Sequence, residues 1–210
     1  MQPTLRLAVT APKLAPRLRA TLRATLSACG VMAACATTNC HAGIVANGEN
    51  WLSRTGSHLQ KVYDQGQTEI FLTGYTWHDP HTYTAAKLAV LNSHAWGLGA
   101  ARRLVDADGS DEMVYAMMFS DSHRNAEPVV GYAKQWIWRP DGGPFSLGAG
   151  YTAGFTSRAD ILNNIPFPIA LPLFSLGIGP VRLYGTYLPR VTSKLNNGNV
   201  AFFFASVPFG

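Results

Sequence analysis

Apolar and polar residues alternate with a period of two through most of the chain after Gly66. The alternation runs in segments of about ten residues, a length typical of strands that cross a membrane as a β-barrel. Residues with strong turn propensity, such as Asn196-Asn197-Gly198, separate the segments. Short connections favour antiparallel neighbours. Eight strands are predicted, at residues 68–77, 93–104, 112–120, 127–139, 143–156, 169–178, 181–188 and 199–207.

A different pattern precedes the strands. Residues 47–65 place apolar side chains on one side of a helix and polar ones on the other, at a spacing of three and four residues. Trp51 and Tyr63 near its two ends suit a membrane surface. The pattern alone is equally compatible with a helix that packs on a soluble core.

Both faces of several predicted strands are apolar, most clearly in Val200-Ala201-Phe202-Phe203-Phe204-Ala205. Aromatic residues gather near the strand ends, where a barrel meets the membrane interface. We therefore predict an all-β fold, an eight-stranded antiparallel transmembrane β-barrel with an N-terminal amphipathic α-helix. Its apolar interior suits an acyl chain better than water or ions. A soluble lipocalin-like barrel is the structural alternative.

Prolines crowd the sixth and seventh predicted strands, including Pro172 and Pro189. Each proline removes one hydrogen-bond donor from the barrel wall, which weakens it locally. We therefore expect a lipid to enter the barrel sideways through this part of the wall. Prolines at strand ends, where they cost little, are the simpler explanation for some of them.

The composition and the distribution of charge indicate where in the cell the protein is expected. The 210 residues are 47% apolar and 14% charged, which excludes a polar disordered protein. The net charge of +5 comes from residues 1–42, which carry five basic residues and no acid, so the remainder is formally neutral. This basic start, a small apolar run and Ala34-Cys35-Ala36 predict a secretory leader over 1–42 with an uncertain cleavage point. Residues 43–66 then form the helical segment and 67–210 the barrel.

The candidate chemistry lies at two strand ends. Asp121-Ser122 follows the third predicted strand, and His78 ends the first. A histidine beside a tryptophan at a strand end is also a common interface residue. Since neighbours in an extended strand point to opposite faces, Asp121 and Ser122 face one site only if the chain bends there.

A series of motifs resembles the outer-membrane lipid A palmitoyltransferase family (PagP), in order over about residues 48–208. They are Y-T-W-H (75–78), W-G-L-G (96–99), Y-A-M-M-F-S-D-S (115–122), E-P-V-V-G-Y (127–132), W-R-P (138–140), L-G-A-G-Y-T-A-G-F-T-S-R (147–158), I-P-F-P-I-A-L-P (165–172), G-I-G-P-V (177–181), T-Y-L-P (186–189) and N-N-G-N-V (196–200). Each motif alone is weak, but the series is specific.

The resemblance implies an enzyme of the bacterial outer membrane that moves a palmitoyl chain from the sn-1 position of a glycerophospholipid onto lipid A. It implies no cofactor or metal, and we expect a monomer. His78, Asp121 and Ser122 match the family's catalytic residues, at the extracellular end. His78 suits a general base, Asp121 suits orientation of its imidazole, and Ser122 suits either a nucleophile or an oxyanion donor.

Two departures from the family affect the expected substrate and its access. Ala133 stands where the family has a glycine at the floor of the acyl-chain site, so we expect a preference for palmitate or a slightly shorter chain. Pro172 and Pro189 match the prolines that flank the family's lateral phospholipid gate. The opposite gate has Thr73 and Ala95 where prolines are usual.

Two rival functions remain open at this point. One is a non-catalytic outer-membrane barrel that serves as an anchor or adhesin, and the other is a soluble lipocalin-like lipid carrier. No glycine-rich phosphate loop follows a strand, which argues against nucleotide binding. Nothing in the sequence indicates nucleic-acid chemistry either. The histidines lack the paired spacing of a metal site.

Overall fold

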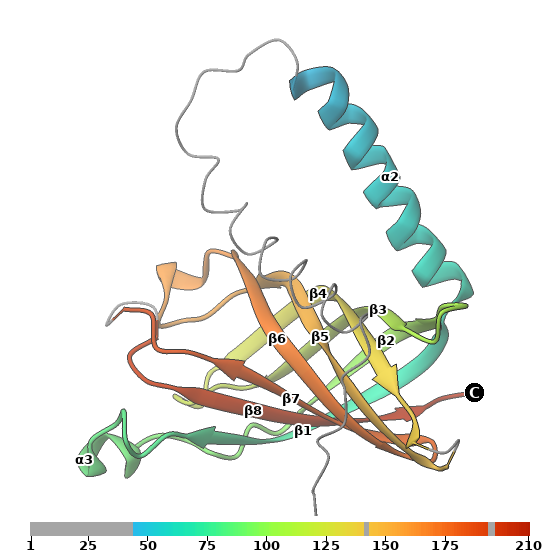
Figure 1. The fold of residues 1–210 in the computed structure, drawn as a ribbon. Coiled ribbons are helices and arrows are strands. Elements are labelled where there is room, and N and C mark those ends of the chain that lie inside the picture. Colours follow the sequence, from blue (N-terminus) through green and yellow to red (C-terminus); the bar gives the residue numbers. More distant parts are fainter. Residues whose placement is uncertain (1–43, 141–142, 193–195) are drawn as a thin grey trace, which may run out of the picture. The chain divides into compact units, whose positions relative to one another are not determined.

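The computed structural model describes residues 44–140, 143–192 and 196–210. The leader predicted at 1–42, with its cysteines, lies outside the described residues. Residues from Leu52 to Gly210 form one compact unit. Its main feature is a closed barrel of eight antiparallel strands in chain order, β1 to β8, in which β8 pairs with β1 (Figure 1). This confirms the predicted fold class.

The strands match the alternating segments closely. They are β1 (Gln67–His78), β2 (Gly97–Val105), β3 (Asp111–Ser120), β4 (Ala126–Trp138), β5 (Phe145–Thr156), β6 (Phe167–Ile178), β7 (Val181–Leu188) and β8 (Val200–Pro208). The helices are α2 (Ile44–Gln65), the short α3 (Ala85–Leu88) and the 3-10 helix η2 (Leu162–Asn164). β2 begins four residues later than predicted, because residues 93–96 bond to β1 and to Ser120 at the end of β3 instead of continuing a ladder.

The outer surface of the barrel is apolar. Outward positions on strands β1 to β7 carry large exposed hydrophobic side chains, among them Leu72, Tyr75, Leu98, Met118, Val130, Phe155, Phe174 and Leu183. Monomeric soluble proteins rarely expose so large a continuous apolar area. The exterior therefore favours a barrel surrounded by lipid over the soluble lipocalin-like alternative. Among the described residues, no helix is both long and apolar enough to cross a membrane.

The helix α2 exposes most of its apolar residues as well. Trp51, Leu52 and Tyr63 are each more than half exposed, whereas Val62 is fully buried. At the end of the helix the guanidinium of Arg102 donates to the backbone oxygens of Tyr63 (2.7 Å) and Asp64 (3.3 Å). These bonds satisfy carbonyl groups that a helix end leaves without partners. The helix thus ends against strand β2.

The interior of the barrel is divided into two layers. One is an apolar core of aromatic and aliphatic side chains that includes Phe71, Met113, Leu173, Tyr184 and Phe204. The other is a polar layer nearer the end of the barrel opposite His78, formed by side chains of β1, β2, β3, β6 and β7. There Arg103 bonds Glu69 (2.8 Å) and Asp111 (2.9 Å), and Arg182 contacts Asp111 (3.5 Å) and Ser175 (3.2 Å).

The strand ladders of the wall are interrupted in two places, and the first lies between β6 and β7. The ladder between β6 and β7 ends at the pair Leu173 and Thr186, although both strands continue beyond it. The unpaired stretch of β6 contains Pro168 and Pro172, which lack the N–H that a ladder needs. The hydroxyl of Thr186 donates to the carbonyl oxygen of Pro172 at 2.8 Å, and no ladder pair follows. The predicted weak wall thus coincides with an open ladder.

A second interruption lies between β1 and β2, whose ladder ends at Thr73 and Gly97. Here residues 93–95 close the gap. The hydroxyl of Thr73 donates to the carbonyl oxygen of Ala95 at 2.5 Å, and the N–H of Thr76 donates to Ser93 at 2.9 Å. The two interruptions therefore differ. Two hydrogen bonds from β1 to residues 93–95 bridge the β1–β2 gap, whereas among the described residues the bond from Thr186 to Pro172 is the one found across the β6–β7 gap.

Candidate active site

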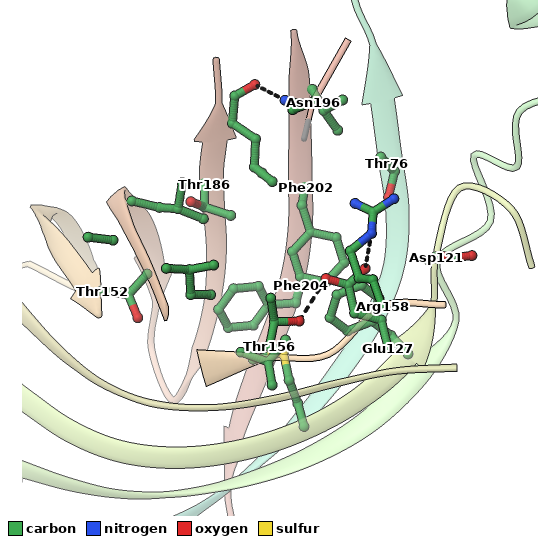
Figure 2. Close-up of a pocket in the computed structure, with 18 of the residues that line it drawn as sticks. Thr76, Asp121, Glu127, Thr152, Thr156, Arg158, Thr186, Asn196, Phe202 and Phe204 are labelled. Atoms are coloured by element: carbon green, nitrogen blue, oxygen red, sulfur yellow. Dashed lines mark hydrogen bonds and ion pairs between the residues drawn. The ribbon is translucent and has the colours of Figure 1, made fainter. Parts of the chain in front are cut away.

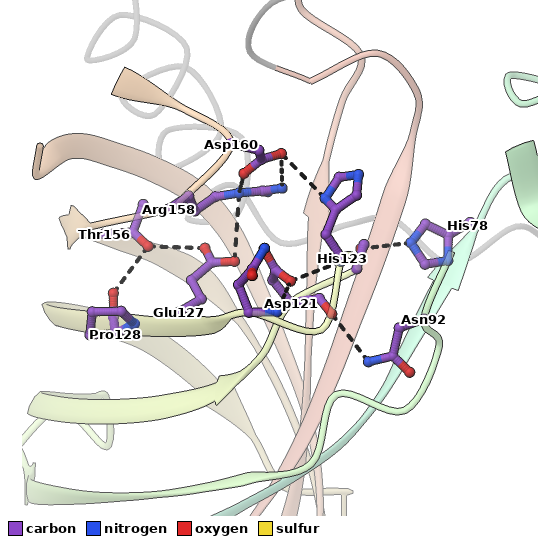
Figure 3. Close-up of polar contacts among 11 residues, drawn as sticks. His78, Asn92, Asp121, His123, Glu127, Pro128, Thr156, Arg158 and Asp160 are labelled. Atoms are coloured by element: carbon purple, nitrogen blue, oxygen red, sulfur yellow. Dashed lines mark hydrogen bonds and ion pairs between the residues drawn. The ribbon is translucent and has the colours of Figure 1, made fainter. Parts of the chain in front are cut away.

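His78 and Ser122 meet at one end of the barrel. His78 is the last residue of β1 and Ser122 lies in the turn between β3 and β4. The Nε2 atom of His78 is 2.8 Å from Oγ of Ser122 (Figure 3). The imidazole is buried, and its ring also makes an edge contact with Tyr83 at a centroid distance of 5.7 Å. An imidazole hydrogen-bonded to a hydroxyl is the arrangement that acyl transfer uses to activate a hydroxyl.

Asp121 shapes the turn that carries Ser122. Its Oδ1 accepts the backbone N–H groups of His123 (2.8 Å) and Asn125 (2.7 Å), a local pattern for which aspartate is well suited. The chain bends here, so that Asp121 and Ser122 both line the same cavity. Asp121 is buried, and its Oδ2 has no hydrogen-bond partner within the described ranges. Its carboxylate bonds the turn, and no contact between it and His78 is observed among these residues.

The cavity extends from this turn into the apolar core. Its volume is about 350 Å³. Asp121 and Ser122 line it together with Phe71, Met113 and Leu173 of the apolar core. Figure 2 shows Thr152, Phe202 and Phe204 among the lining residues. The wall is mainly apolar, with aromatic rings of Phe202 and Phe204 stacked 5.7 Å apart on one side. Such a lining suits a hydrocarbon chain.

Ala133 faces the interior and is fully buried, but it does not line the cavity. In the ladders it pairs with Met113 on β3 and with Thr152 on β5, and both of these residues do line the cavity. Ala133 therefore lies at the level of the cavity residues Met113 and Thr152, and their side chains separate it from the cavity. Met113 is the cavity residue that sequence reasoning missed, because no pattern distinguishes one inward methionine from another.

Pro172 and Pro189 lie at the interruption between β6 and β7. Pro189 and the β6 residues from Phe167 to Leu171 line the cavity, so the cavity reaches this part of the wall. Pro172 points outward in the strand and its carbonyl accepts from Thr186. The two prolines predicted to flank a lateral opening thus border the open ladder.

A group of charged residues lies on the other side of the turn from His78 (Figure 3). Arg158 bonds Asp160 through two atoms, at 3.0 and 2.9 Å, and lies 3.8 Å from Glu127. Asp160 in turn lies 3.3 Å from Nδ1 of His123. Burial alone would raise the pKa of Asp160, but the hydrogen bonds and charge of Arg158 outweigh it and hold that pKa below its ordinary value. These contacts fasten the β5–β6 loop to the turn.

The β5–β6 loop has an unusual backbone. Leu162, Asn163 and Asn164 have φ values of 50°, 51° and 66°, in the left-handed region. Asparagine tolerates this region, whereas leucine does so only at a cost of roughly 1–3 kcal/mol. The loop carries Arg158 and Ile161, which both line the cavity. Sequence reasoning did not single out this loop, because its charges pair with distant residues.

Asn92 is a further residue that the sequence did not reveal. It lies between α3 and β2, and its side chain and backbone bond to the turn that carries Ser122. Elsewhere at this end of the barrel, Asp121, His123 and Asp160 place potential ligand atoms within 4.8 Å of one another. Arg158 already neutralises Asp160, so an ion pair accounts for this cluster.

An eight-stranded barrel with an imidazole–hydroxyl pair at the mouth of an apolar cavity defines a class of enzyme that acts on lipid. Residues 58–206 match the sequence profile of the family described as "Antimicrobial peptide resistance and lipid A acylation protein PagP". The chain belongs to this family, and it is an acyltransferase that acylates lipid A.

Relatives with the description "Lipid A acyltransferase PagP" cover most of the chain. The protein of Bordetella pertussis (strain Tohama I) is 39% identical over 160 residues, which are 76% of this chain and 86% of the relative. That of Laribacter hongkongensis is 42% identical over 149 residues, 71% and 70% of the two chains. That of Erwinia amylovora is 38% identical over 166 residues, 77% and 85% of the two chains.

Proposed function

We propose that this protein transfers a palmitoyl chain, or a slightly shorter one, from the sn-1 position of a glycerophospholipid to lipid A in the outer membrane. The observation that carries the proposal is a mainly apolar cavity that begins at Ser122 and reaches the open ladder between β6 and β7. A donor lipid needs both features, because its acyl chain must leave the bilayer sideways and its ester must stop beside the catalytic groups.

The acyl chain would lie along the aromatic wall of the cavity, with its ester at the mouth. The rings of Phe202 and Phe204 stack on each other and form part of the mainly apolar lining. The chain would enter between Pro172 and Pro189, where β6 and β7 are not joined. The apolar outer surface of the same strands would keep the donor in contact with lipid until it enters.

The imidazole of His78 would act as the base. In the direct route, a hydroxyl of lipid A attacks the carbonyl carbon of the donor ester and His78 Nε2 accepts its proton. Collapse of the tetrahedral intermediate breaks the ester bond, and His78 returns the proton to the oxygen of the leaving lysophospholipid. In this route Ser122 would donate a hydrogen bond to the oxyanion of the tetrahedral intermediate.

In the covalent route, Ser122 itself attacks after giving its proton to His78. The lysophospholipid leaves with that proton. A lipid A hydroxyl then gives its proton to His78 and attacks the acyl group, and Ser122 leaves with the proton that His78 returns to its Oγ. The 2.8 Å contact between His78 and Ser122 supports both routes. Asp121 would serve both by fixing the turn, and its second carboxylate oxygen is available to stabilise a protonated imidazole.

The level of Ala133 would set the depth of the site. Its methyl group lies behind Met113 and Thr152. It would push their side chains towards the cavity, because protein interiors leave little free space, and the site would then accept a chain about one methylene shorter. Lipid A would meet the enzyme at the end of the barrel that carries His78, and we propose that this end lies on the extracellular side.

Mass spectrometry of lipid A tests the proposal. Cells with the protein should carry lipid A with the added mass of one long acyl group, and cells without it should not. Purified protein with phospholipids labelled separately at sn-1 and sn-2 should transfer only the sn-1 chain. Transfer of the sn-2 chain, or unchanged lipid A, would contradict the proposal.

A further inference from the structure

Asn92 joins the segment after His78 to the turn that carries Ser122. It is buried, and it lies 14 residues after His78 in the chain connection between β1 and β2. Figure 3 shows Asn92 and His78 on the same side of the turn, with the charged group on the other side. The residue is thus placed between the two strand ends that form the site.

The bonds of Asn92 hold both peptide groups next to Ser122. Its backbone N–H donates to the carbonyl oxygen of Ser122 at 2.8 Å. Its side-chain Nδ2 lies 3.1 Å from the carbonyl oxygen of Asp121 and 3.2 Å from Oγ of Ser120. Since a peptide group is planar, fixing the planes before and after one residue fixes its φ and ψ. The direction of the Ser122 side chain follows from these two angles.

A second set of bonds belongs to the local turn alone. Oδ1 of Asn92 accepts the N–H of His94 at 3.0 Å, and Nδ2 lies 2.9 Å from the carbonyl oxygen of the same residue. The Oδ1 bond is the ordinary turn of asparagine or aspartate, which either residue makes. The bond to Asp121 needs an amide N–H, so only asparagine makes both.

We infer that Asn92 is a positioning residue, whose amide N–H groups set the distance between Ser122 and His78. The inference rests on the proposed function, in which the His78–Ser122 pair carries the reaction. It goes beyond that function because it assigns the geometry of the pair to a third residue on another segment.

The variants N92D and N92A test the inference, with K87A as a control. Aspartate has the same shape as asparagine and keeps the bond from His94, but it loses the donors to Asp121 and Ser120. Lys87 is an exposed residue of α3 in the same connection, and its side chain lies outside the site. The amount of folded barrel is measured for each variant by its resistance to unfolding in SDS without heating. Rates are then expressed per amount of folded protein.

We expect N92D and N92A to lower kcat roughly 10- to 100-fold, because a displacement of about 1 Å has effects of this size. KM for the donor should stay within about twofold, since the acyl cavity is untouched, and K87A should match the wild type. Wild-type kcat in N92D would overturn the inference and assign Asn92 to the local turn alone, whether or not N92A folds.

A nuclear magnetic resonance measurement separates this outcome from failure of the proposed function. The ring nitrogens of His78, labelled with 15N in detergent micelles, report its bond to Ser122. In N92D their signals should move to the positions seen in S122A, whereas K87A should leave them in place. Unmoved signals in N92D would overturn the inference. Transfer that persists in both H78A and S122A would instead overturn the proposed site.

Discussion

Nε2 of His78 lies 2.8 Å from Oγ of Ser122 across a separation of 44 residues in the chain. Replacing either residue by alanine removes one partner of this hydrogen bond. We expect H78A and S122A each to lower acyl transfer by roughly 100-fold or more, because a positioned base or oxyanion donor contributes about 10²- to 10⁴-fold. The measurement is transfer of a labelled acyl chain by purified protein in detergent.

A serine outside the site provides the control for S122A. Ser57 is exposed on α2 and its hydroxyl bonds only within the helix, to the carbonyl oxygen of Ser53 at 2.9 Å. S57A should keep wild-type transfer. Transfer by folded S122A at the rate of S57A would show that the hydroxyl has no part in the reaction.

The length of the transferred chain should depend on Met113 and Ala133. M113A removes the cavity side chain itself, so the preferred chain should lengthen by roughly two to three methylenes. A133G removes one methyl group from behind the wall and should lengthen it by about one. Competition between phospholipids with defined sn-1 chains measures the preference.

Met118 offers a matched control for chain length. It lies on the same strand, faces outward and is 56% exposed. M118A should leave the preferred length unchanged. A shift in M118A equal to that in M113A would mean that the change came from the barrel as a whole and not from the cavity.

A covalent link across the β6–β7 interruption should block donor access. Continuing the register beyond Leu173 and Thr186 brings position 172 opposite 187. In a protein whose three native cysteines are replaced by serine, the oxidised P172C/Y187C pair should lose most transfer and a reductant should restore it. The same pair engineered at Leu176 and Leu183, which the ladder already joins, should leave transfer unchanged. Full transfer by the oxidised P172C/Y187C protein would rule out this path.

The ion pair between Arg158 and Asp160 should make the loop sensitive to acid. The pKa of Asp160 lies below its ordinary value, so its stabilising contribution is complete above about pH 4 and is lost as the pH falls through the lower folded value. Because the carboxylate is one-third exposed, D160N should lower the free energy of unfolding at pH 7 by less than about 1 kcal/mol.

Denaturant unfolding in micelles at pH 7 and pH 3 measures this effect. The difference between the wild type and D160N should shrink at pH 3, because Asp160 of the unfolded wild type binds a proton below its ordinary pKa. A difference of the same size at both pH values would show that the charge of Asp160 does not stabilise the loop.

The architecture followed from the sequence because a closed barrel imposes a simple rule. Alternation with a period of two places one residue inside and the next outside, so each strand records its own two faces. The start of β2 was placed too early because residues 93–96 have the same alternation as a strand. Their backbone groups bond Thr76, Ser120 and Thr73 instead, and such partners are not encoded locally.

The site was only partly predictable from the sequence. The resemblance named His78 and Ser122, and the structure brings them into contact. Asn92 and Arg158 remained hidden because the partners that link them to the site, Asp121 and Ser122 for Asn92 and Glu127 for Arg158, are far away in the chain. The carboxylate of Asp121 shows a related difficulty, because its bonds to the following turn are set by backbone geometry that a sequence pattern does not specify.

The polar layer below the cavity bears on what else this barrel lets through. Arg103 and Arg182 contact Glu69, Asp111 and Ser175, so charged or polar groups from β1, β2, β3, β6 and β7 are linked across the inside of the barrel. A small solute would have to break these links to pass from one mouth to the other. We therefore expect this barrel to leave the permeability of the membrane around it unchanged.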